Sequence, residues 1–169
     1  NQHHRWVEQK PFVQYLLGGT ITKEHYIMYL QQFFRVYSNL EYYSELAQLI
    51  QDLPDLKRSN NILQDLGELG NVNIGPIWPS TEKYRSRILE LYYDTENRHK
   101  LMSHIYVRHM GDLYGGQYIA KTVPGSGKFY QFDNVEELRN SIRAELTDDL
   151  GPEAIVAFQW AIKIMKALT

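Results

Sequence analysis

The sequence lacks cysteine, and this absence excludes several kinds of chemistry. None of the 169 residues is a cysteine, so the chain forms no disulfide, has no thiolate nucleophile, and cannot ligate an iron–sulfur cluster or the commonest structural zinc sites. A metal would have to be held by histidine, carboxylate, tyrosine or a bound cofactor. The sequence also lacks an apolar run near the ~18 residues of a membrane-spanning helix, so we expect a soluble protein with no membrane partner.

The chain also lacks an excess of either positive or negative charge. The chain has 18 basic and 20 acidic residues and a formal net charge of −2. No basic run is present that could follow a phosphate backbone, so nucleic acid is not an expected partner. The length predicts a single domain over residues 1–169, large enough to bury a core and a pocket. We expect this domain to be a monomer.

Apolar residues recur with a helical period almost throughout, and no alternating run of strand length is present, so the predicted fold is all-α. Thr22 and Asn134 are expected to cap helices, Pro54 to lie in a first turn, and Thr81 to cap the helix that follows a loop over residues 67–79. The expected helices cover about residues 2–9, 11–18, 22–50, 54–63, 81–93, 95–122, 134–146 and 151 onwards, with an extended stretch at 129–132.

The stretch from Tyr106 to Gln117 is unusual because it places three glycines, Gly111, Gly115 and Gly116, inside an amphipathic helix. Each glycine in a helix interior costs about 0.5–1 kcal/mol relative to alanine, so the three together give up roughly 2–3 kcal/mol. Gly111 and Gly115 lie about 40° apart on one face of a helix. Two interpretations remain open: a second helix crosses closely over this bare face, or a flat ligand lies against it.

His4 is the candidate metal ligand among six histidines. Glu8 follows one turn later and could accept the second ring N–H, which would fix the tautomer of a metal-ligating imidazole. A surface ion pair, or a tag remnant formed with the adjacent His3, is the alternative interpretation. The remaining histidines have no partner one turn away that makes a two-histidine metal site, and we expect them to be structural or exposed: His25, His99, His104 and His109.

Asp112 and the arginines supply the other candidate groups. Asp112 follows Gly111, and Arg108, one turn earlier, is its expected charge partner. Such an acid could order water beside a ligand, although an ordinary surface salt bridge is the alternative. Arg139 and Arg143 are spaced i, i+4, so both guanidiniums share a helix face. They could bind carboxylates or simply form a solvated basic stripe.

These residues resemble the heme oxygenase family. The distal-helix signature of that family is close to R-Y-L-G-D-L-S-G-G-Q, and residues 108–117 read R-H-M-G-D-L-Y-G-G-Q. The segment from Phe12 to Tyr26, F-V-Q-Y-L-L-G-G-T-I-T-K-E-H-Y, is similar to the first helix-to-helix turn of the family. The resemblance extends over essentially the whole chain. It implies a single-domain helical bundle that holds heme between a proximal helix and a kinked distal helix.

The resemblance also implies a role for each candidate residue. It places the axial ligand of the heme iron on His4, supported by Glu8. It places a tyrosine of the distal hydrogen-bond network on Tyr37, which with Asp112 and Arg108 would hold the water that delivers protons. The remaining implied heme contacts are the bare face of Gly111, Gly115 and Gly116 against the porphyrin, and Arg139, Arg143 and Tyr106 near the propionates.

Heme oxygenases bind heme as both substrate and cofactor, so the resemblance implies an enzyme. With O2 and reducing equivalents, members cleave heme at the α-meso carbon to biliverdin IXα, carbon monoxide and ferrous iron. The absence of a hydrophobic carboxy-terminal tail resembles the bacterial, plastid and viral members, which favours ferredoxin as electron donor. A bilin reductase would then be a downstream partner. The expected location is the cytoplasm, or the plastid stroma if a transit peptide has been removed.

Three positions depart from the family pattern. Tyr114 replaces a serine, His109 replaces a tyrosine, and Ile162 stands where some members carry a phenylalanine. Regiospecificity and product release are the properties that these changes would affect.

Other functions on the same fold can be compared with this one. Thiaminase-type hydrolases need a cysteine, which is absent, and the Glu-x-x-His pairing of ferritin-like di-iron sites is not evident. A heme-binding carrier without turnover remains the alternative function.

Overall fold

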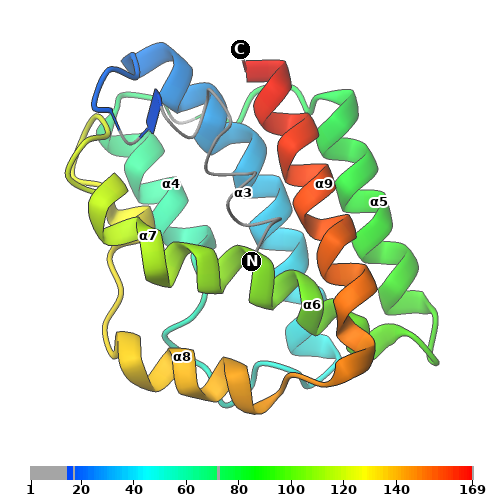
Figure 1. Ribbon diagram of the computed structural model, residues 1–169. Helices are drawn as coiled ribbons and strands as arrows, with labels where there is room; N and C mark the ends of the chain where they lie inside the picture. The colour runs from blue at the N-terminus through cyan, green and yellow to red at the C-terminus, as the bar shows by residue number, and fades with distance from the viewer. Residues whose placement is uncertain (1–14, 17, 72, 169) are drawn as a thin grey trace.

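The computed structural model describes residues 15–16, 18–71 and 73–168, and within them the chain is all-helical, as predicted, with no strand (Figure 1). The α-helices are α3 (Lys23–Leu46), α4 (Ser59–Glu68), α5 (Pro79–Tyr93), α6 (Leu101–Ile105), α7 (Gly111–Ile119), α8 (Val135–Ala144) and α9 (Gly151–Leu168). A π-helical turn, η2 (Tyr106–Met110), joins α6 to α7. Short 3-10 turns lie at η1 (Arg98–Lys100), η3 (Lys128–Tyr130) and η4 (Asp148–Leu150). The helix predicted over residues 2–9 lies outside the described residues.

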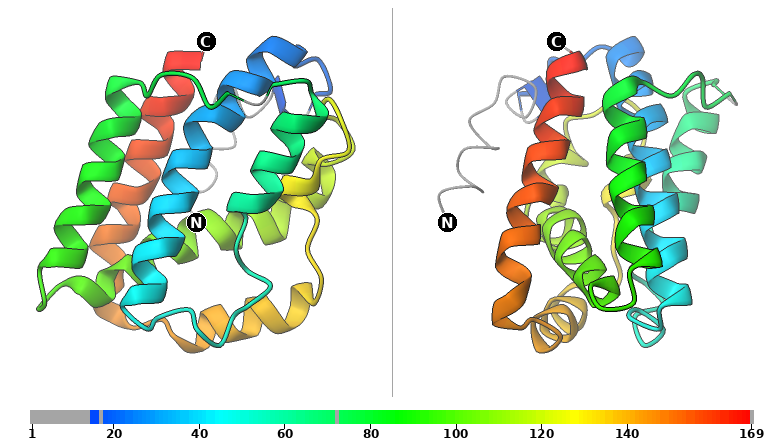
Figure 2. Two further views of the ribbon diagram at one scale, coloured as in Figure 1. Left: turned by 180° about the vertical axis from the view of Figure 1, so that it is seen from behind. Right: turned by 90° about the vertical axis from the view of Figure 1, so that its right-hand side faces the viewer.

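Three long helices, α3, α5 and α9, run side by side and form the main layer of the bundle (Figure 1; Figure 2). Residues 101–119, which comprise α6, η2 and α7, form one rod that crosses this layer, and we call this rod the interrupted helix. α4 packs on α3, and α8 lies at one end of the bundle. The apolar faces meet in one core, whose largest fully buried side chains include Tyr26, Tyr84, Phe33 and Phe129.

The start of α3 follows the prediction, and its end does not. Thr22 caps the helix because its side chain accepts a hydrogen bond from the backbone N–H of His25 at 3.2 Å. The helix ends at Leu46 rather than near residue 50, since the chain turns at Gln48, which has a φ of 59°. Neither glycine nor proline stands between residues 47 and 50 to signal this turn. The local sequence therefore does not predict where α3 ends.

The prediction that a helix begins near Pro54 is wrong, because α4 begins at Ser59. The carboxylate of Glu41 on α3 accepts hydrogen bonds from the backbone N–H groups of Arg58 at 2.6 Å and of Ser59 at 3.1 Å. The first N–H groups of a helix have no partner within the helix, so an acceptor from elsewhere favours a start at that point. A side chain on another helix therefore decides where α4 begins.

The prediction that Thr81 caps the next helix is also wrong. α5 begins at Pro79, which fits the first turn because a proline has no N–H that would need a partner there. Thr81 is fully buried inside the helix, and its hydroxyl donates to the side-chain oxygen of Gln32 on α3 at 2.8 Å. The same oxygen accepts the backbone N–H of Trp78 at 3.0 Å. Thr81 thus ties α5 to α3 instead of capping.

The single helix predicted over residues 95–122 is replaced by several shorter elements. Residues 98–100 form η1, and the interrupted helix changes from α-helical to π-helical at Tyr106 and back at Gly111. A π turn adds a residue to the helical repeat and is frequent at functional sites. It shifts the side chains that follow it relative to those before it. No glycine or proline lies within residues 106–110, so the sequence did not signal the change.

The last part of the chain combines a wrong prediction with confirmed ones. Residues 128–130 form η3, so the extended stretch predicted at 129–132 is largely wrong. Asn134 precedes α8 as predicted, but its side chain makes no capping bond, and the helix ends at Ala144. α9 begins at Gly151, as predicted. Among the described residues, no helix combines the length and apolarity needed to span a membrane.

Candidate functional site

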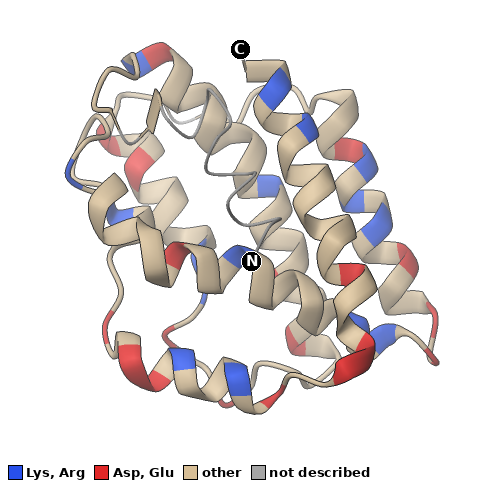
Figure 3. Ribbon diagram, in the orientation of Figure 1, with Lys and Arg blue, Asp and Glu red and all other residues tan. Residues whose placement is uncertain are grey.

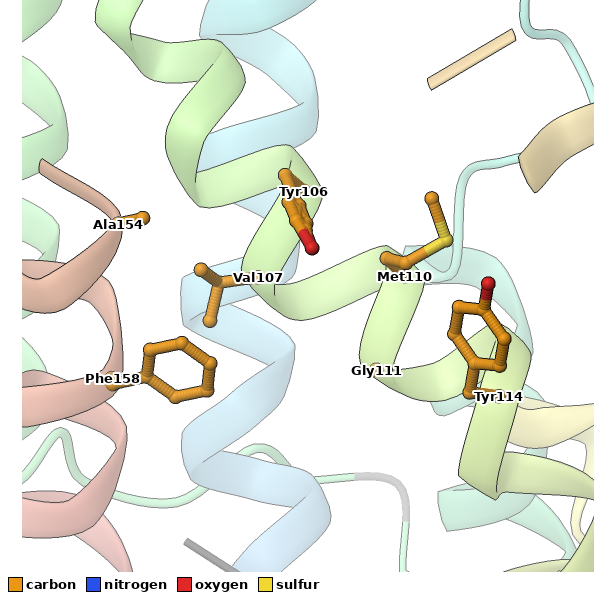
Figure 4. A pocket seen from close by; sticks show the side chains of 7 residues that line it. All are labelled: Tyr106, Val107, Met110, Gly111, Tyr114, Ala154 and Phe158. Atoms are coloured by element: carbon orange, nitrogen blue, oxygen red, sulfur yellow. The ribbon is translucent and has the colours of Figure 1, made fainter. Parts of the chain in front are cut away.

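A cavity of about 360 Å³ opens between the interrupted helix and α9 (Figure 4). A second cavity, of about 560 Å³, extends from it toward the turn between α8 and α9 and shares three of its lining residues, Tyr106, Ala154 and Phe158. Cavities of this size and apolar character are typical of small-molecule sites. The lining of the first cavity is mostly apolar and consists of Tyr106, Val107, Met110, Gly111, Tyr114, Ala154 and Phe158.

Two of the three glycines face open space, and the third does not. Apart from its chain neighbours and the backbone of its own helix, a Cβ atom placed on Gly111 or on Gly115 would meet no described atom within 4 Å. At Gly116 it would lie 2.8 Å from Cδ1 of Tyr130, which is too close for any real side chain. The close-crossing interpretation therefore applies to Gly116, and the open face belongs to Gly111 and Gly115. Contact of Gly116 with heme stays a prediction, but Tyr130 already explains why the residue is glycine.

Behind the open face, Asp112 is held by Tyr37. The phenol of Tyr37, on α3, donates a hydrogen bond to Oδ2 of Asp112, so the fold joins two residues that are 75 positions apart. Burial, and then the charge of Asp112, raise the pKa of Tyr37, so it remains a donor. Burial also raises the pKa of Asp112 to about 6, although the bond from Tyr37 opposes this shift. The carboxyl group can therefore gain and lose a proton near neutral pH.

Arg108 is buried, but it does not form the predicted ion pair with Asp112. The described residues hold no ion pair between the two side chains, but their charges still interact: burial raises the pKa of Asp112, and the charge of Arg108 opposes that shift. The π turn explains why the ion pair is missing, since residues four apart stack on one another only in a regular α-helix. Nε of Arg108 is buried without a hydrogen-bond partner in the described part of the chain. Such a donor can bind water or a ligand.

His109, on the π turn, forms a buried pair with Glu41. Nε2 of His109 lies 2.8 Å from Oε2 of Glu41, and the side chains are 0% and 2% exposed. Burial alone would raise the pKa of Glu41, but the bonds that it accepts from His109 and Ser59 hold it below its ordinary value. Nδ1 of His109 has no hydrogen-bond partner among the described residues, and its ring lies edge-on to Tyr37 with centroids 5.1 Å apart. Glu41 thus connects the π turn to both α3 and α4.

His104, five residues earlier, lies in a second buried network that joins α5, α6 and α9. Its Nδ1 lies 3.1 Å from the hydroxyl of Tyr84, and its Nε2 lies 2.9 Å from Oε1 of Glu153. Arg87 donates to both oxygens of Glu153, at 3.0 and 2.8 Å. Burial alone would raise the pKa of Glu153, but the bonds from His104 and Arg87 lower it to about 2. Both ring nitrogens of His104 therefore have partners.

Arg139 and Arg143 lie on one face of α8, as predicted, and both are directed at Tyr114. The guanidinium of Arg139 lies 4.0 Å from the centroid of the Tyr114 ring, and that of Arg143 lies 5.6 Å from it. Arg139 also donates to the backbone carbonyl of Leu113 at 3.3 Å. Acidic and basic residues both occur along α8, so this helix does not present a uniform basic stripe (Figure 3). Through Tyr114, the two arginines border the first cavity.

His4 and Glu8 lie outside the described residues, so the predicted iron ligand stays a prediction. Among residues 15–16, 18–71 and 73–168, no group of three or more histidines, cysteines or acids could hold a metal ion. Three of the four histidines expected to be structural or exposed follow that expectation. His104 and His109 are fully buried in the networks described above, whereas His99 is 47% exposed.

Sequence reasoning missed the side chains that close the cavity and brace the interrupted helix. Ala154 and Phe158 lie four residues apart on α9, a spacing that could have marked a shared face. Met110 lies within the glycine motif, but nothing distinguishes it from an ordinary core residue. Glu41 gave no signal at all, because its partner His109 is 68 residues away.

Comparison with known proteins relates this arrangement to one family. A family model described as Heme oxygenase matches residues 1–150. Among curated proteins, the chain is similar to a heme oxygenase of Porphyra purpurea, with 31% identity over 200 residues that cover 98% of this chain and 81% of the relative.

Solved structures show the same fold. Heme oxygenase-1 of the cyanobacterium Synechocystis sp. PCC6803, solved in complex with heme, superimposes with a TM-score of 0.84 at 24% identity, over 99% of this chain and 87% of that chain. The heme oxygenase of Leptospira interrogans superimposes with a TM-score of 0.85, also at 24% identity, over 98% of this chain and 93% of that chain. At this level of identity the two structures establish the fold alone.

Proposed function

The chain belongs to the heme oxygenase family, and from this membership we propose that it binds heme and cleaves it oxidatively at the α-meso carbon. The products would be biliverdin IXα, carbon monoxide and ferrous iron, formed with O2 and reducing equivalents. Bound heme supplies both the iron that activates O2 and the ring that is oxidised. The protein contributes binding, orientation and control of protons.

The observation that carries this proposal is a bare cavity wall with a titratable acid behind it. Gly111 lines the first cavity, and the space where its Cβ would lie is free of described atoms within 4 Å. A flat ring can therefore approach the backbone of the interrupted helix. Asp112, the next residue, is bonded to Tyr37. Ring binding and proton handling are thus assigned to adjacent residues on different sides of the same helix.

The proton-handling role follows from the properties of three side chains. Burial raises the pKa of Asp112 to about 6, so both of its protonation states are accessible near neutral pH. Tyr37 orients the carboxyl group through its hydrogen bond. Nε of Arg108, a buried donor without a described partner, can hold water close to them. We assign the three as the groups that hold and move a proton at the distal side.

The remaining predicted residues would bind the heme. His4 would ligate the iron, with Glu8 fixing its tautomer. Apolar residues of α9 would contact the ring edge. The open face of two glycines and the basic residues at the cavity border support the predicted heme surface. The residues that we propose for this surface are Gly111, Gly115, Gly116, Tyr106, Arg139 and Arg143.

We further propose that ferredoxin supplies the electrons, that a bilin reductase consumes the product, and that the protein acts as a monomer. Turnover assays with ferredoxin and its reductase, or with a flavoprotein reductase alone, would separate the possible donors. Gel filtration with light scattering would give the mass in solution, against a chain mass of 19.9 kDa.

The proposal is tested by reducing the hemin-loaded protein with ferredoxin, its reductase and NADPH in air. We expect the heme absorption to be replaced by that of biliverdin, with the product identified by chromatography. Asp112→Asn should bind hemin normally but turn it over about 10²–10⁴-fold more slowly, the usual range for loss of a proton-transfer group. Gln117→Ala, an exposed change on the same helix, is the matched control and should behave as the parent.

Three outcomes would contradict these assignments. If heme is bound but its spectrum is unchanged during reducing turnover, the protein is a carrier and not an oxygenase. If Asp112→Asn forms biliverdin at the parent rate, the proton role of Asp112 is wrong. For the iron ligand, His4→Ala should lose the spectrum of histidine-ligated heme, and its persistence would assign the ligand to another residue.

A further inference from the structure

We propose that Tyr114 is a specificity-determining residue, whose hydroxyl binds one carboxylate of the porphyrin and so fixes the orientation of the ring within its plane. The inference rests on the proposed function, because a porphyrin with two propionates is taken as the substrate. It adds a residue to the site, since the position is a serine in the family signature that the glycine motif resembles.

Tyr114 occupies the mouth of the first cavity. It lies on α7 one turn after Gly111, and its ring stands in the cavity lining next to Met110 (Figure 4). It is also 40% exposed, so one side of the residue meets the cavity and the other meets solvent. A carboxylated porphyrin buries its apolar ring and leaves its carboxylates near water. The position of Tyr114 therefore matches the polar end of such a molecule.

The ring of Tyr114 is held in place by α8. The guanidinium of Arg139 lies 4.0 Å from the ring centroid and that of Arg143 lies 5.6 Å from it, within the range of cation–π attraction. Arg139 is itself positioned by its bond to the carbonyl of Leu113 and by Glu136, 3.5 Å away. A tyrosine ring that two cations restrain has fewer available orientations. Its hydroxyl is therefore a donor in a defined position rather than a mobile one.

One donor beside the ring still lacks a partner. Nε of Arg139 is buried and makes no hydrogen bond to any described residue. A buried donor of this kind calls for an acceptor that the protein does not supply. A carboxylate at the mouth of the cavity would accept a bond from the phenol, and the positive charges of the two arginines beside the ring would favour its binding.

The orienting effect follows from the shape of a protoporphyrin. Its two propionates lie on adjacent pyrrole rings, so rotating the ring within its plane moves both of them and brings a different meso carbon toward the interior. A serine at position 114 would be too short to reach the acceptor, and the two arginines would lose the ring that they contact. Tyrosine thus restricts the in-plane rotation, and with it the carbon that is cleaved.

The test measures the binding of zinc protoporphyrin IX and of its dimethyl ester, whose zinc does not activate O2 and so allows no turnover, and the biliverdin isomers formed from hemin. Tyr114→Phe removes the hydroxyl and keeps the ring. We expect it to lose about tenfold in affinity for the diacid and nothing for the diester, as for a bond to a charged group. The same variant should also give a mixture of biliverdin isomers. Tyr118→Phe, at a 61% exposed tyrosine one turn later, is the matched control.

The result that overturns the inference is a Tyr114→Phe protein with the parent preference for diacid over diester and the parent isomer composition. The proposed function fails differently. If the parent binds neither zinc porphyrin, both proposals are wrong. If it binds both porphyrins but never forms biliverdin, only the oxygenase assignment is lost, and the diacid preference of Tyr114→Phe still decides the role of the hydroxyl.

Discussion

The inner face and the cavity face of the interrupted helix differ in how completely they are packed. On the inner face, His104 and His109 are bonded to buried carboxylates, and Gly116 lies directly against Tyr130. On the cavity face, the space beside Gly111 is free of described atoms within 4 Å. The interrupted helix is thus closely packed around the buried pairs and Gly116, whereas it is open beside Gly111. The difference shows that a binding surface can be left unfilled when the opposite surface holds the backbone in place.

The two faces contribute opposite terms to stability. Each glycine on the cavity face gives up about 0.5–1 kcal/mol relative to alanine. On the inner face, removing the histidine of a buried His–Glu pair lowers the free energy of unfolding, because each remaining partner loses a buried hydrogen bond. Changes to the inner face should therefore unfold the protein, whereas changes to the cavity face should affect ligand binding. Four substitutions test this contrast by the free energy of unfolding of the protein without heme.

His104→Ala should have the largest effect. It takes a hydrogen-bond partner from both Tyr84 and Glu153, although Glu153 keeps its bonds from Arg87, so we expect a loss of about 2–4 kcal/mol, measured by urea denaturation. His109→Ala is the comparison, and its loss should be smaller because only one side chain, Glu41, loses a partner. Equal losses of unfolding free energy in the two variants would mean that the bond between His104 and Tyr84 adds nothing to stability.

Gly116→Ala should lower the free energy of unfolding by about 1–3 kcal/mol, the usual range for overpacking. The added Cβ would lie 2.8 Å from Tyr130, whose hydroxyl is fixed by Tyr29 at 2.7 Å, so the ring cannot move aside freely. Urea denaturation measures the change. An unaltered midpoint would show that the inner face is less rigid than its contacts indicate.

Asp112→Asn should raise stability at alkaline pH by about 1–2 kcal/mol. Burial raises the pKa of Asp112 from 3.8 to about 6, so the native state binds this proton more tightly than the unfolded state does. The stabilisation is complete below pH 3.8 and is lost as the pH rises through about 6. Asparagine does not ionise, so the variant should melt higher than the parent at pH 8 and equally at the acid end. A difference that is independent of pH would contradict the raised pKa.

Gly111→Ala should have the smallest effect on folding, a gain of about 0.5–1 kcal/mol from the better helix former. Its methyl group would enter the cavity, so hemin affinity should fall although stability rises. Gly67→Ala is the matched control, because Gly67 is also helical and its Cβ position is equally free of described atoms. It should give the same gain without a change in hemin binding. Unchanged hemin binding by Gly111→Ala would place the ring elsewhere.

The sequence predicted those parts of the fold whose signals are local. Thr22 caps α3 through a bond that spans three residues, and Gly151 begins α9 at the predicted position. The start of α4 was mispredicted because Glu41, 17 residues away, provides the acceptor for it. The π turn was missed for a related reason, since the buried pair of His109 with Glu41 bridges 68 residues.

The features of the candidate site also separate into those that local sequence predicts and those that depend on distant residues. The bare face and its neighbouring acid were predicted because Gly111 and Asp112 are adjacent in sequence. The contact of Asp112 with Tyr37 rested on the family resemblance, since no pattern in a single sequence links positions 75 residues apart. The stacking of Arg139 on Tyr114 was not foreseen at all.

The sequence by itself determined which chemistry this protein has available. It contains no thiol, it places an acid beside a run of glycines, and it spaces two arginines one helical turn apart. Only the tertiary structure decided that Gly111 is open while Gly116 is covered, that Asp112 is bonded to Tyr37, and that Tyr114 stands at the cavity mouth. The physical reason is that open space, burial and pKa depend on neighbours that are distant along the chain.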